Sequence, residues 1–194
     1  MPRLFAGLEL PDAIRDDLAG LDMPLPGTRW VDWDDLHLTL RFIGDVDRAT
    51  AEDFASYLED IDADALQITL SNVGVFTQKD PKSLWVGADG GEALNRLARL
   101  TERAARNAGL PAKPHAFKPH VTLARLRAPD PARLARYLQK FARFKTEPFL
   151  VTHFSLFSAR PKVGGGPYVV ENAYPLLGGL SRGGLAMHPE GDLG

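Results

Sequence analysis

The sequence of 194 residues contains no cysteine. Without cysteine the chain can form no disulfide, no thiolate metal site and no cysteine nucleophile. Its length fits one domain, or one domain built from two similar lobes. Hydrophobic residues make up 44% of the chain and charged residues 25%, which is typical of a soluble globular protein.

The chain also has no large excess of one charge and no long apolar run. Its formal net charge is −2, so no overall positive field attracts long nucleic acids, and RNA or DNA would have to be bound locally, at an end. The opening residues MPRLFAGLEL carry a short apolar run that stops at Pro11. This run is too short for a signal-peptide core or a membrane span, so we expect a cytoplasmic protein with no membrane contact.

Common cofactor motifs are missing as well. There is no Gly-x-x-x-x-Gly-Lys-Ser/Thr loop and no Gly-x-Ser-x-Gly elbow, and GGGPY at 164–168 follows a predicted strand without opening a helix. A zinc site needs three or four ligands at defined spacings. His115, His153 and His188 form no His-Glu-x-x-His or His-x-His pattern. The sequence therefore predicts neither a metal nor a nucleotide cofactor.

The predicted secondary structure follows one order twice. Apolar and alternating stretches predict strands, and apolar residues at helical spacing predict helices. The predicted strands are 3–10, 30–44, 66–78, 83–88, 117–126, 148–160 and 167–176, and the predicted helices are 11–21, 47–61, 91–109 and 130–141. Each half contains a β-α-β-α-β pattern, which predicts a single α/β domain over 1–176 with lobes at about 1–80 and 81–176. The Gly-rich residues 177–194 show no periodicity and are expected to form a flexible tail.

The tetrapeptide pattern His-x-Thr-Leu occurs in both halves, as HLTL at 37–40 and HVTL at 120–123. Each copy lies on the middle strand of its half. One copy alone would fit the solvated face of an amphipathic strand, because short patterns match by chance. Two copies at equivalent positions favour a functional site over strand packing. If a pseudo-twofold axis relates the lobes, the two strands contribute their side chains to one cleft.

Side chains alternate along a strand, so His37, Thr39 and Arg41 are expected on one face of the first motif strand. The opposite face, which should be core, would carry Leu36, Leu38, Leu40 and Phe42. On the second motif strand His120 and Thr122 share a face. Each lobe would therefore present an imidazole and a hydroxyl to the cleft.

Two imidazoles and two hydroxyls in one cleft suit the chemistry of a phosphodiester. Histidine titrates near neutrality, so one ring can act as a neutral base while the other acts as a cationic acid. Threonine hydroxyls can hydrogen-bond the non-bridging oxygens, and a nearby arginine would balance the charge that develops on them. Such a pair could hydrolyse a strained cyclic phosphodiester without a metal.

Six stretches of the chain together resemble the RNA 2′,3′-cyclic phosphodiesterases of bacteria and archaea, also named RNA 2′-5′ ligases, of the two-histidine phosphoesterase superfamily. These stretches are RLFAGLEL, RWVDWDDLHLTLRFIG, FKPHVTLAR and the late SLFSARP, GGGPYVV and YPL segments. The resemblance covers about residues 2–176. It implies a bilobal, pseudo-twofold fold whose mainly antiparallel sheets flank a central cleft.

The reaction that the resemblance implies is the opening of a terminal 2′,3′-cyclic phosphate on RNA to a 2′-phosphomonoester, with no metal or nucleotide cofactor. Some relatives also join tRNA halves through a 2′-5′ linkage, which is the reverse chemistry with a 5′-hydroxyl in place of water. The implied partner is an RNA 3′ end with a cyclic phosphate, and we expect the protein to act as a monomer.

The resemblance also implies a role for each motif residue. His37 would be the proton donor to the leaving 3′-oxygen, and His120 the base that activates water. Thr39 and Thr122 would bind the phosphate, and Arg125 is associated with the same site. Strict alternation places Arg125 on the face opposite His120, so either the strand bulges or twists after the motif, or the arginine reaches around the strand end.

Two alternatives remain open at this point. A module of the same fold could bind a nucleotide or an RNA end without turnover, although two complete motifs argue against it. The substrate could also be a small cyclic phosphate, such as a 2′,3′-cyclic mononucleotide. The aromatic side chains of Phe5, Phe76, Trp85 and Tyr168 would either stack on a base at the rim of the cleft or pack in the core.

Overall fold

The computed structural model describes residues 3–77, 79–159 and 168–177 of the chain. The predicted tail therefore lies outside the described residues, apart from Leu177. The strands are β1 (Arg3–Glu9), β2 (Thr28–Trp30), β3 (His37–Asp45), β4 (Leu66–Val75), β5 (Ser83–Asp89), β6 (His120–Leu126), β7 (Phe149–Val151), β8 (His153–Ala159) and β9 (Tyr168–Pro175). The helices are α1 (Asp12–Ala19), α2 (Arg48–Glu59), α3 (Gly91–Asn107) and α4 (Pro131–Lys140), and a 3-10 turn, η1 (Trp33–Asp35), precedes β3.

Local sequence signals account for the helices. Asp47 is the N-cap of α2, and its carboxylate accepts a hydrogen bond from the Thr50 amide at 2.9 Å. Asp130 does the same for α4 through the Arg133 amide at 2.8 Å, with a proline in the first turn. None of the helices in the described part of the chain is long and apolar enough to cross a membrane.

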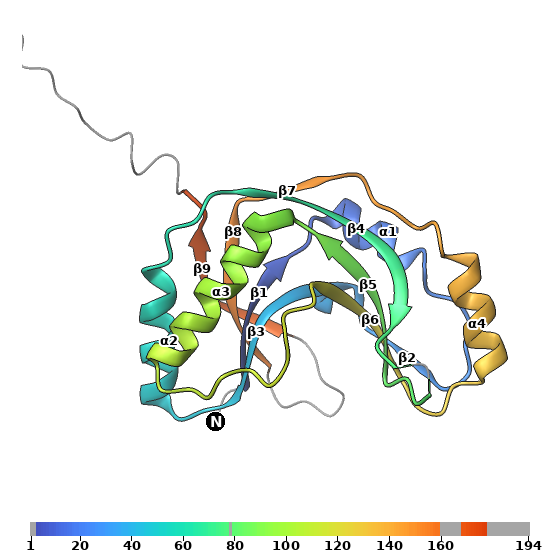
Figure 1. Cartoon of the computed structure of the whole chain (residues 1–194), viewed down its shortest axis with the longest axis horizontal. Coiled ribbons are helices and arrows are strands. Elements are labelled where there is room, and N and C mark those ends of the chain that lie inside the picture. Colours follow the sequence, from blue (N-terminus) through green and yellow to red (C-terminus); the bar gives the residue numbers. More distant parts are fainter. Residues whose placement is uncertain (1–2, 78, 160–167, 178–194) are drawn as a thin grey trace, which may run out of the picture.

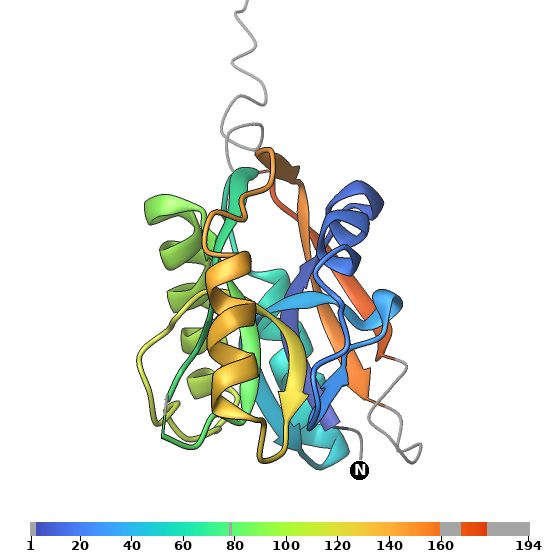
Figure 2. The same ribbon diagram turned by 90° about the vertical axis from the view of Figure 1, so that its right-hand side faces the viewer.

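The described strands form one curled, antiparallel sheet in the order β7-β4-β5-β6-β3-β1-β8-β9, and β2 pairs with β6. Figure 1 shows this sheet as an arch with two limbs, one formed by β3, β1, β8 and β9 and the other by β6, β5, β4 and β7. Helices α2 and α3 lie at the first limb and α4 lies at the second, and Figure 2 shows α4 in front of the sheet. Buried apolar side chains from both limbs form one continuous core. The predicted α/β fold with mainly antiparallel strands is confirmed.

The two limbs of the sheet do not coincide with the two halves of the sequence. Strand β4 belongs to the first half but pairs with β5, because a short connection joins them into a hairpin. Strands β8 and β9 belong to the second half, but β8 pairs with β1. The predicted single strand 148–160 is also divided at Thr152, so that β7 joins one limb and β8 the other.

The two motif strands, β3 and β6, are neighbours at the centre of the sheet. Among the described residues a single register pair, Leu38 with Val121, connects them. Both side chains have a relative exposure of 0%. The two limbs therefore meet at the residues that lie between histidine and threonine in each motif.

A β-bulge changes the expected alternation along β3. The register between β1 and β3 skips Leu40, so Leu40 and Arg41 both turn toward the interior, with exposures of 3% and 9%. Phe42 is 51% exposed. The predictions that Arg41 shares the face of His37 and that Phe42 lies in the core are therefore wrong.

The buried Arg41 joins β3 to α3 and to the segment that leads into β6. Its Nε lies 2.7 Å from a carboxylate oxygen of Glu102 on α3. Its other nitrogens donate to the carbonyl oxygens of Phe42 and Pro111, at 2.6 and 2.5 Å. The carboxylate of Glu102 also accepts a hydrogen bond from the Lys113 amide at 3.2 Å. This ion pair therefore fixes the approach to the second motif against the strand of the first.

Replacing one partner of this pair should destabilise the protein, because the other charge is then left largely buried. We expect Glu102→Ala to lower the free energy of unfolding by roughly 3 kcal/mol. The matched control is Glu92→Ala, which removes an ion pair of the same helix whose partners, Glu92 and Arg99, are 76% and 62% exposed. It should cost less than about 1 kcal/mol. Urea unfolding measures both, and equal losses would show that the Arg41 pair behaves as a surface pair.

Candidate active site

The register between β3 and β6 places four motif residues together on one face of the sheet. Counted outward from the Leu38–Val121 pair in antiparallel order, His37 falls opposite Thr122 and Thr39 falls opposite His120. Each histidine therefore has one threonine on its own strand and another on the neighbouring strand. The two motif strands, which the sequence predicted to contribute to one cleft, are neighbours in one sheet.

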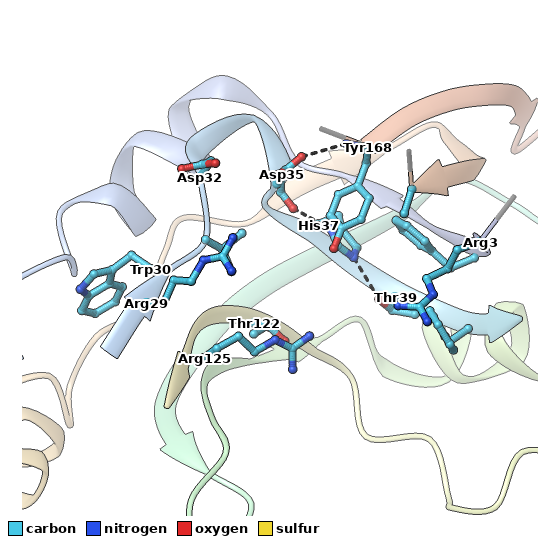
Figure 3. Close-up of a pocket in the computed structure, with 14 residues that line it drawn as sticks. Arg3, Arg29, Trp30, Asp32, Asp35, His37, Thr39, Thr122, Arg125 and Tyr168 are labelled. Carbon is cyan, nitrogen blue, oxygen red and sulfur yellow. Dashed lines mark hydrogen bonds between the residues drawn. The ribbon is translucent and has the colours of Figure 1, made fainter. Parts of the chain in front are cut away.

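A cavity of about 550 Å³ opens on this face, and Figure 3 shows its lining. It contains four of the five predicted site residues, namely His37, Thr39, Thr122 and Arg125. His120 is not part of this lining. It is nevertheless near His37, because the residues that follow the two histidines, Leu38 and Val121, are register partners.

Both histidine rings are held in the same way by the backbone. The Nδ1 atom of His37 lies 2.6 Å from the carbonyl oxygen of Asp35, and that of His120 lies 2.6 Å from the carbonyl oxygen of Lys118. A carbonyl oxygen only accepts hydrogen bonds, so each Nδ1 carries a proton and donates it. Each Nε2 is then the nitrogen that can exchange a proton with a ligand. In His37 it lies 3.1 Å from the Thr39 hydroxyl.

Aromatic side chains surround the His37 ring. The ring of Phe5 lies 4.6 Å from it, and the edge-on ring of Tyr168 lies 4.9 Å from it. Phe5 is only 2% exposed, so its ring packs against the histidine and offers no face to a base. Of the two roles left open by the sequence, base stacking and core packing, Phe5 has the second. The amide of Tyr168 also donates to the buried carboxylate of Asp35 at 3.0 Å. This bond fastens β9 to the turn that holds His37.

His120 has an equivalent but more open surround. Phe76 meets its ring edge-on at 4.9 Å, and Trp85 lies 6.4 Å away. Phe76 is 47% exposed and lies beside Lys118, whose Nζ is 6.0 Å from the ring centre. Base stacking at the rim therefore stays a prediction for Phe76, the most exposed of the four aromatics.

The site lowers the pKa of both imidazoles. Burial is the main cause for His37 and brings its pKa to about 4, against the opposing effect of the hydrogen bond to the Asp35 carbonyl. Positive charge on Arg125 and on His120 lowers it further. Burial also lowers the pKa of His120, and Arg125 adds to the effect. Without a bound anion, both rings are therefore neutral at physiological pH.

A second β-bulge brings Arg125 to the cavity. The register between β5 and β6 skips Leu123, so Leu123 and Ala124 are both buried, with exposures of 2% and 0%. The next residue, Arg125, then lies on the same face as Thr122 and is exposed. Of the two possibilities left by the sequence, the strand therefore bulges.

The bulge occupies the same motif position in both strands, namely the leucine that ends His-x-Thr-Leu. In β3 it brings Phe42 to the cavity, and in β6 it brings Arg125 there. The two halves therefore place a phenylalanine and an arginine at equivalent positions. This difference makes an otherwise pseudo-symmetric site electrostatically one-sided.

Several lining residues had no signal in the motif pattern. Arg29 and Asp32 come from β2 and the segment after it, Asp35 from η1, and Arg3 from β1. Strand β2 is only three residues long and pairs with β6. Three residues are too few for an alternating pattern to predict a strand. Among the side chains that the structure describes, no group of three or more histidines, aspartates or glutamates is arranged to hold a metal ion.

The chain matches the model of the LigT-like phosphoesterase family twice, over residues 8–86 and 84–168. Similar proteins include RNA 2′,3′-cyclic phosphodiesterases. That of Aquifex aeolicus is 32% identical over 167 residues, which cover 82% of this chain and 86% of the relative. That of Aeropyrum pernix is 34% identical over 116 residues, which cover 59% of this chain and 64% of the relative, just under two thirds.

Solved structures agree with this grouping. The structure of TT0787 of Thermus thermophilus has a TM-score of 0.76 and 25% identity, and the match covers 91% of this chain and 99% of that one. E. coli LigT complexed with 3′-AMP has a TM-score of 0.72 and 25% identity, with the same coverage of both chains. The two family matches fall on the two halves that carry the duplicated motif. This chain belongs to the family of LigT-like phosphoesterases.

Proposed function

We propose that this chain is an RNA 2′,3′-cyclic phosphodiesterase that converts a terminal 2′,3′-cyclic phosphate into a 2′-phosphomonoester by paired-histidine acid–base catalysis. The observation that carries the proposal is the placement of two imidazoles around one register pair, each with Nδ1 bound to a carbonyl and Nε2 available. The names of the similar proteins from Aquifex aeolicus and Aeropyrum pernix support the same reaction.

The proposed reaction uses each side chain once. His120 takes a proton from water through Nε2, and the resulting oxygen nucleophile attacks phosphorus. The bond from phosphorus to the 3′-oxygen breaks, and His37 gives its Nε2 proton to that oxygen. The hydroxyls of Thr39 and Thr122 donate hydrogen bonds to the non-bridging oxygens, and Arg125 balances the charge that grows there. The product is a 3′-hydroxyl beside a 2′-phosphomonoester.

Anion binding supplies the charge state that this reaction needs. His37 must be protonated to act as the acid, although its pKa is about 4 in the free protein. A bound phosphodiester carries a negative charge that favours the imidazolium and offsets the field of Arg125. The substrate therefore raises the pKa of His37 as it binds, and the acid is formed only in the complex.

The proposal includes several finer expectations from the sequence. They are a single catalytic domain over 1–176, action as a monomer, a cytoplasmic location, and 2′-5′ joining of tRNA halves as the reverse reaction. Small 2′,3′-cyclic nucleotides remain alternative substrates. A non-catalytic binding module is the alternative function, and it differs by leaving its ligand unchanged.

The first test is turnover in the presence of a chelator. An RNA oligomer that ends in a 2′,3′-cyclic phosphate, incubated with the protein in EDTA, should give an oligomer with a 2′-phosphate, since the proposed acid and base are side chains. Phosphatase treatment and mass spectrometry identify the product end. Activity that requires added divalent metal contradicts the mechanism, and binding without any product supports the binding module.

The second test removes the side chains one at a time. His37→Ala and His120→Ala should each lower turnover by roughly 100- to 10,000-fold, the range for one lost acid or base. The double variant should lose less than the product of the two effects, because the pair acts as a unit. His153→Ala is the matched control, because the Nε2 atom of His153 lies 3.0 Å from the carboxylate of Glu9 and His153 does not line the cavity. If the control loses as much, the histidines contribute only to packing.

The third test concerns the pKa of the two rings. Arg125→Gln removes a positive charge that disfavours both imidazolium ions, so the pKa values of His37 and His120 should rise. NMR titration of the ring nitrogens in the free protein measures this shift. In the wild type the dependence of kcat/KM on pH should be bell-shaped, with its maximum below the usual pKa of histidine, because kcat/KM reports the pKa values of the free enzyme. Unchanged pKa values in the variant would contradict the role given to Arg125.

A further inference from the structure

Two arginines face each other directly across the β2–β6 pair. Arg29 of β2 is the register partner of Arg125 of β6, and both line the cavity. Like charges in directly opposed positions of an antiparallel pair destabilise a sheet. Within the ranges that the structure describes, no carboxylate forms an ion pair with either guanidinium. The fold therefore holds two unneutralised positive charges at one side of the cavity.

The third arginine of the cavity is in a different situation. Arg3 forms an ion pair with Asp45 at 3.6 Å, and its guanidinium lies 5.9 Å from the ring centre of Phe42. Figure 3 shows Arg3 and Arg29 on opposite sides of the His37 and Thr39 pair. The unpaired positive charge is thus concentrated on the Arg29 side.

Asp32 also lies on that side of the cavity. No ion pair joins it to Arg29 in the described part of the chain. A bound anion is therefore the partner that would relieve the repulsion between the two arginines. The cyclic phosphate alone does not account for both, because the proposed mechanism places it between the histidines, where Arg125 balances its charge.

We propose that Arg29 binds a second phosphate, namely the phosphodiester on the 5′ side of the nucleotide that carries the cyclic phosphate, while Arg125 balances the charge of the cyclic phosphate itself. This inference rests on the proposed function. Within an RNA chain, that phosphodiester is the only other anion on the same ribose. The Cβ atoms of opposed residues lie about 5 Å apart, so two guanidiniums can hold two anionic groups of a single nucleotide. The cavity therefore selects the end of an RNA chain over a 5′-hydroxyl cyclic mononucleotide.

The test compares two dinucleotides that end in a 2′,3′-cyclic phosphate and differ only in their linkage. One has the natural phosphodiester and the other an uncharged methylphosphonate. The wild type should have a kcat/KM roughly tenfold or more higher for the charged linkage, the size expected of a charge-assisted hydrogen bond. Arg29→Gln should remove most of this ratio. The matched control is Arg127→Gln, because Arg127 is an exposed arginine just past the end of β6 and outside the lining, and it should keep the ratio.

Two further measurements separate the possible outcomes. Calorimetric titration of the two dinucleotide 2′-phosphate products gives the same comparison as a ratio of Kd values, even if no substrate is turned over. Adenosine 2′,3′-cyclic phosphate with and without a 5′-phosphate shows whether a terminal monoester suffices. An Arg29-dependent preference for the charged dinucleotide supports the inference.

Three results would overturn the inference. They are equal kcat/KM for the two linkages in the wild type, an unchanged ratio in Arg29→Gln, and a gain confined to the 5′-phosphorylated mononucleotide. Failure of the proposed function gives a different result, because then no cyclic phosphate is opened by any variant and only the Kd ratio reports on Arg29.

Discussion

The buried contact between Leu38 and Val121 is the constraint on which the rest of the site depends. It is the register pair that connects the two limbs within the described part of the sheet. Strand side chains have a period of two, so a slip of one residue would turn every motif side chain to the other face. Burial of these two apolar residues thus fixes both histidines and both threonines on the cavity face. The x position of His-x-Thr-Leu is therefore as important for the geometry as the polar positions.

The two β-bulges then determine which side chains line the cavity next to the paired motifs. Each bulge lies at the terminal leucine of its motif, where alternation would otherwise bury the residue two positions further on. In β3 the bulge turns Arg41 inward to Glu102 and leaves Phe42 at the cavity. In β6 it brings Arg125 to the cavity. One duplicated backbone feature thus yields a structural arginine on one side and a candidate anion ligand on the other.

The sequence predicts the elements well because their signals are local. Helical spacing, caps and apolar runs lie within about ten to twenty residues, and the predicted helices and most strands agree with the structure. Strand pairing is not local, so the exchange of β4 and β8 between the limbs could not be predicted from the duplicated order. The paired motifs point to a candidate site because they recur, whereas Arg29 lies on a three-residue strand whose partner is nearly a hundred residues away. The bulges could not be predicted, because the sequences of β3 and β6 are equally compatible with a regular strand and with a bulged one.

The electrostatics of the site connect binding to chemistry. Burial and the positive charge of Arg125 keep both imidazoles neutral in the free protein. Under the proposed mechanism, one ring must gain a proton, and only a negatively charged ligand changes the field in that direction. A neutral ligand of the same shape would occupy the cavity without forming the acid. The low pKa of His37 is therefore compatible with the proposed role of proton donor, because binding of the anionic substrate would favour the protonated form of the ring.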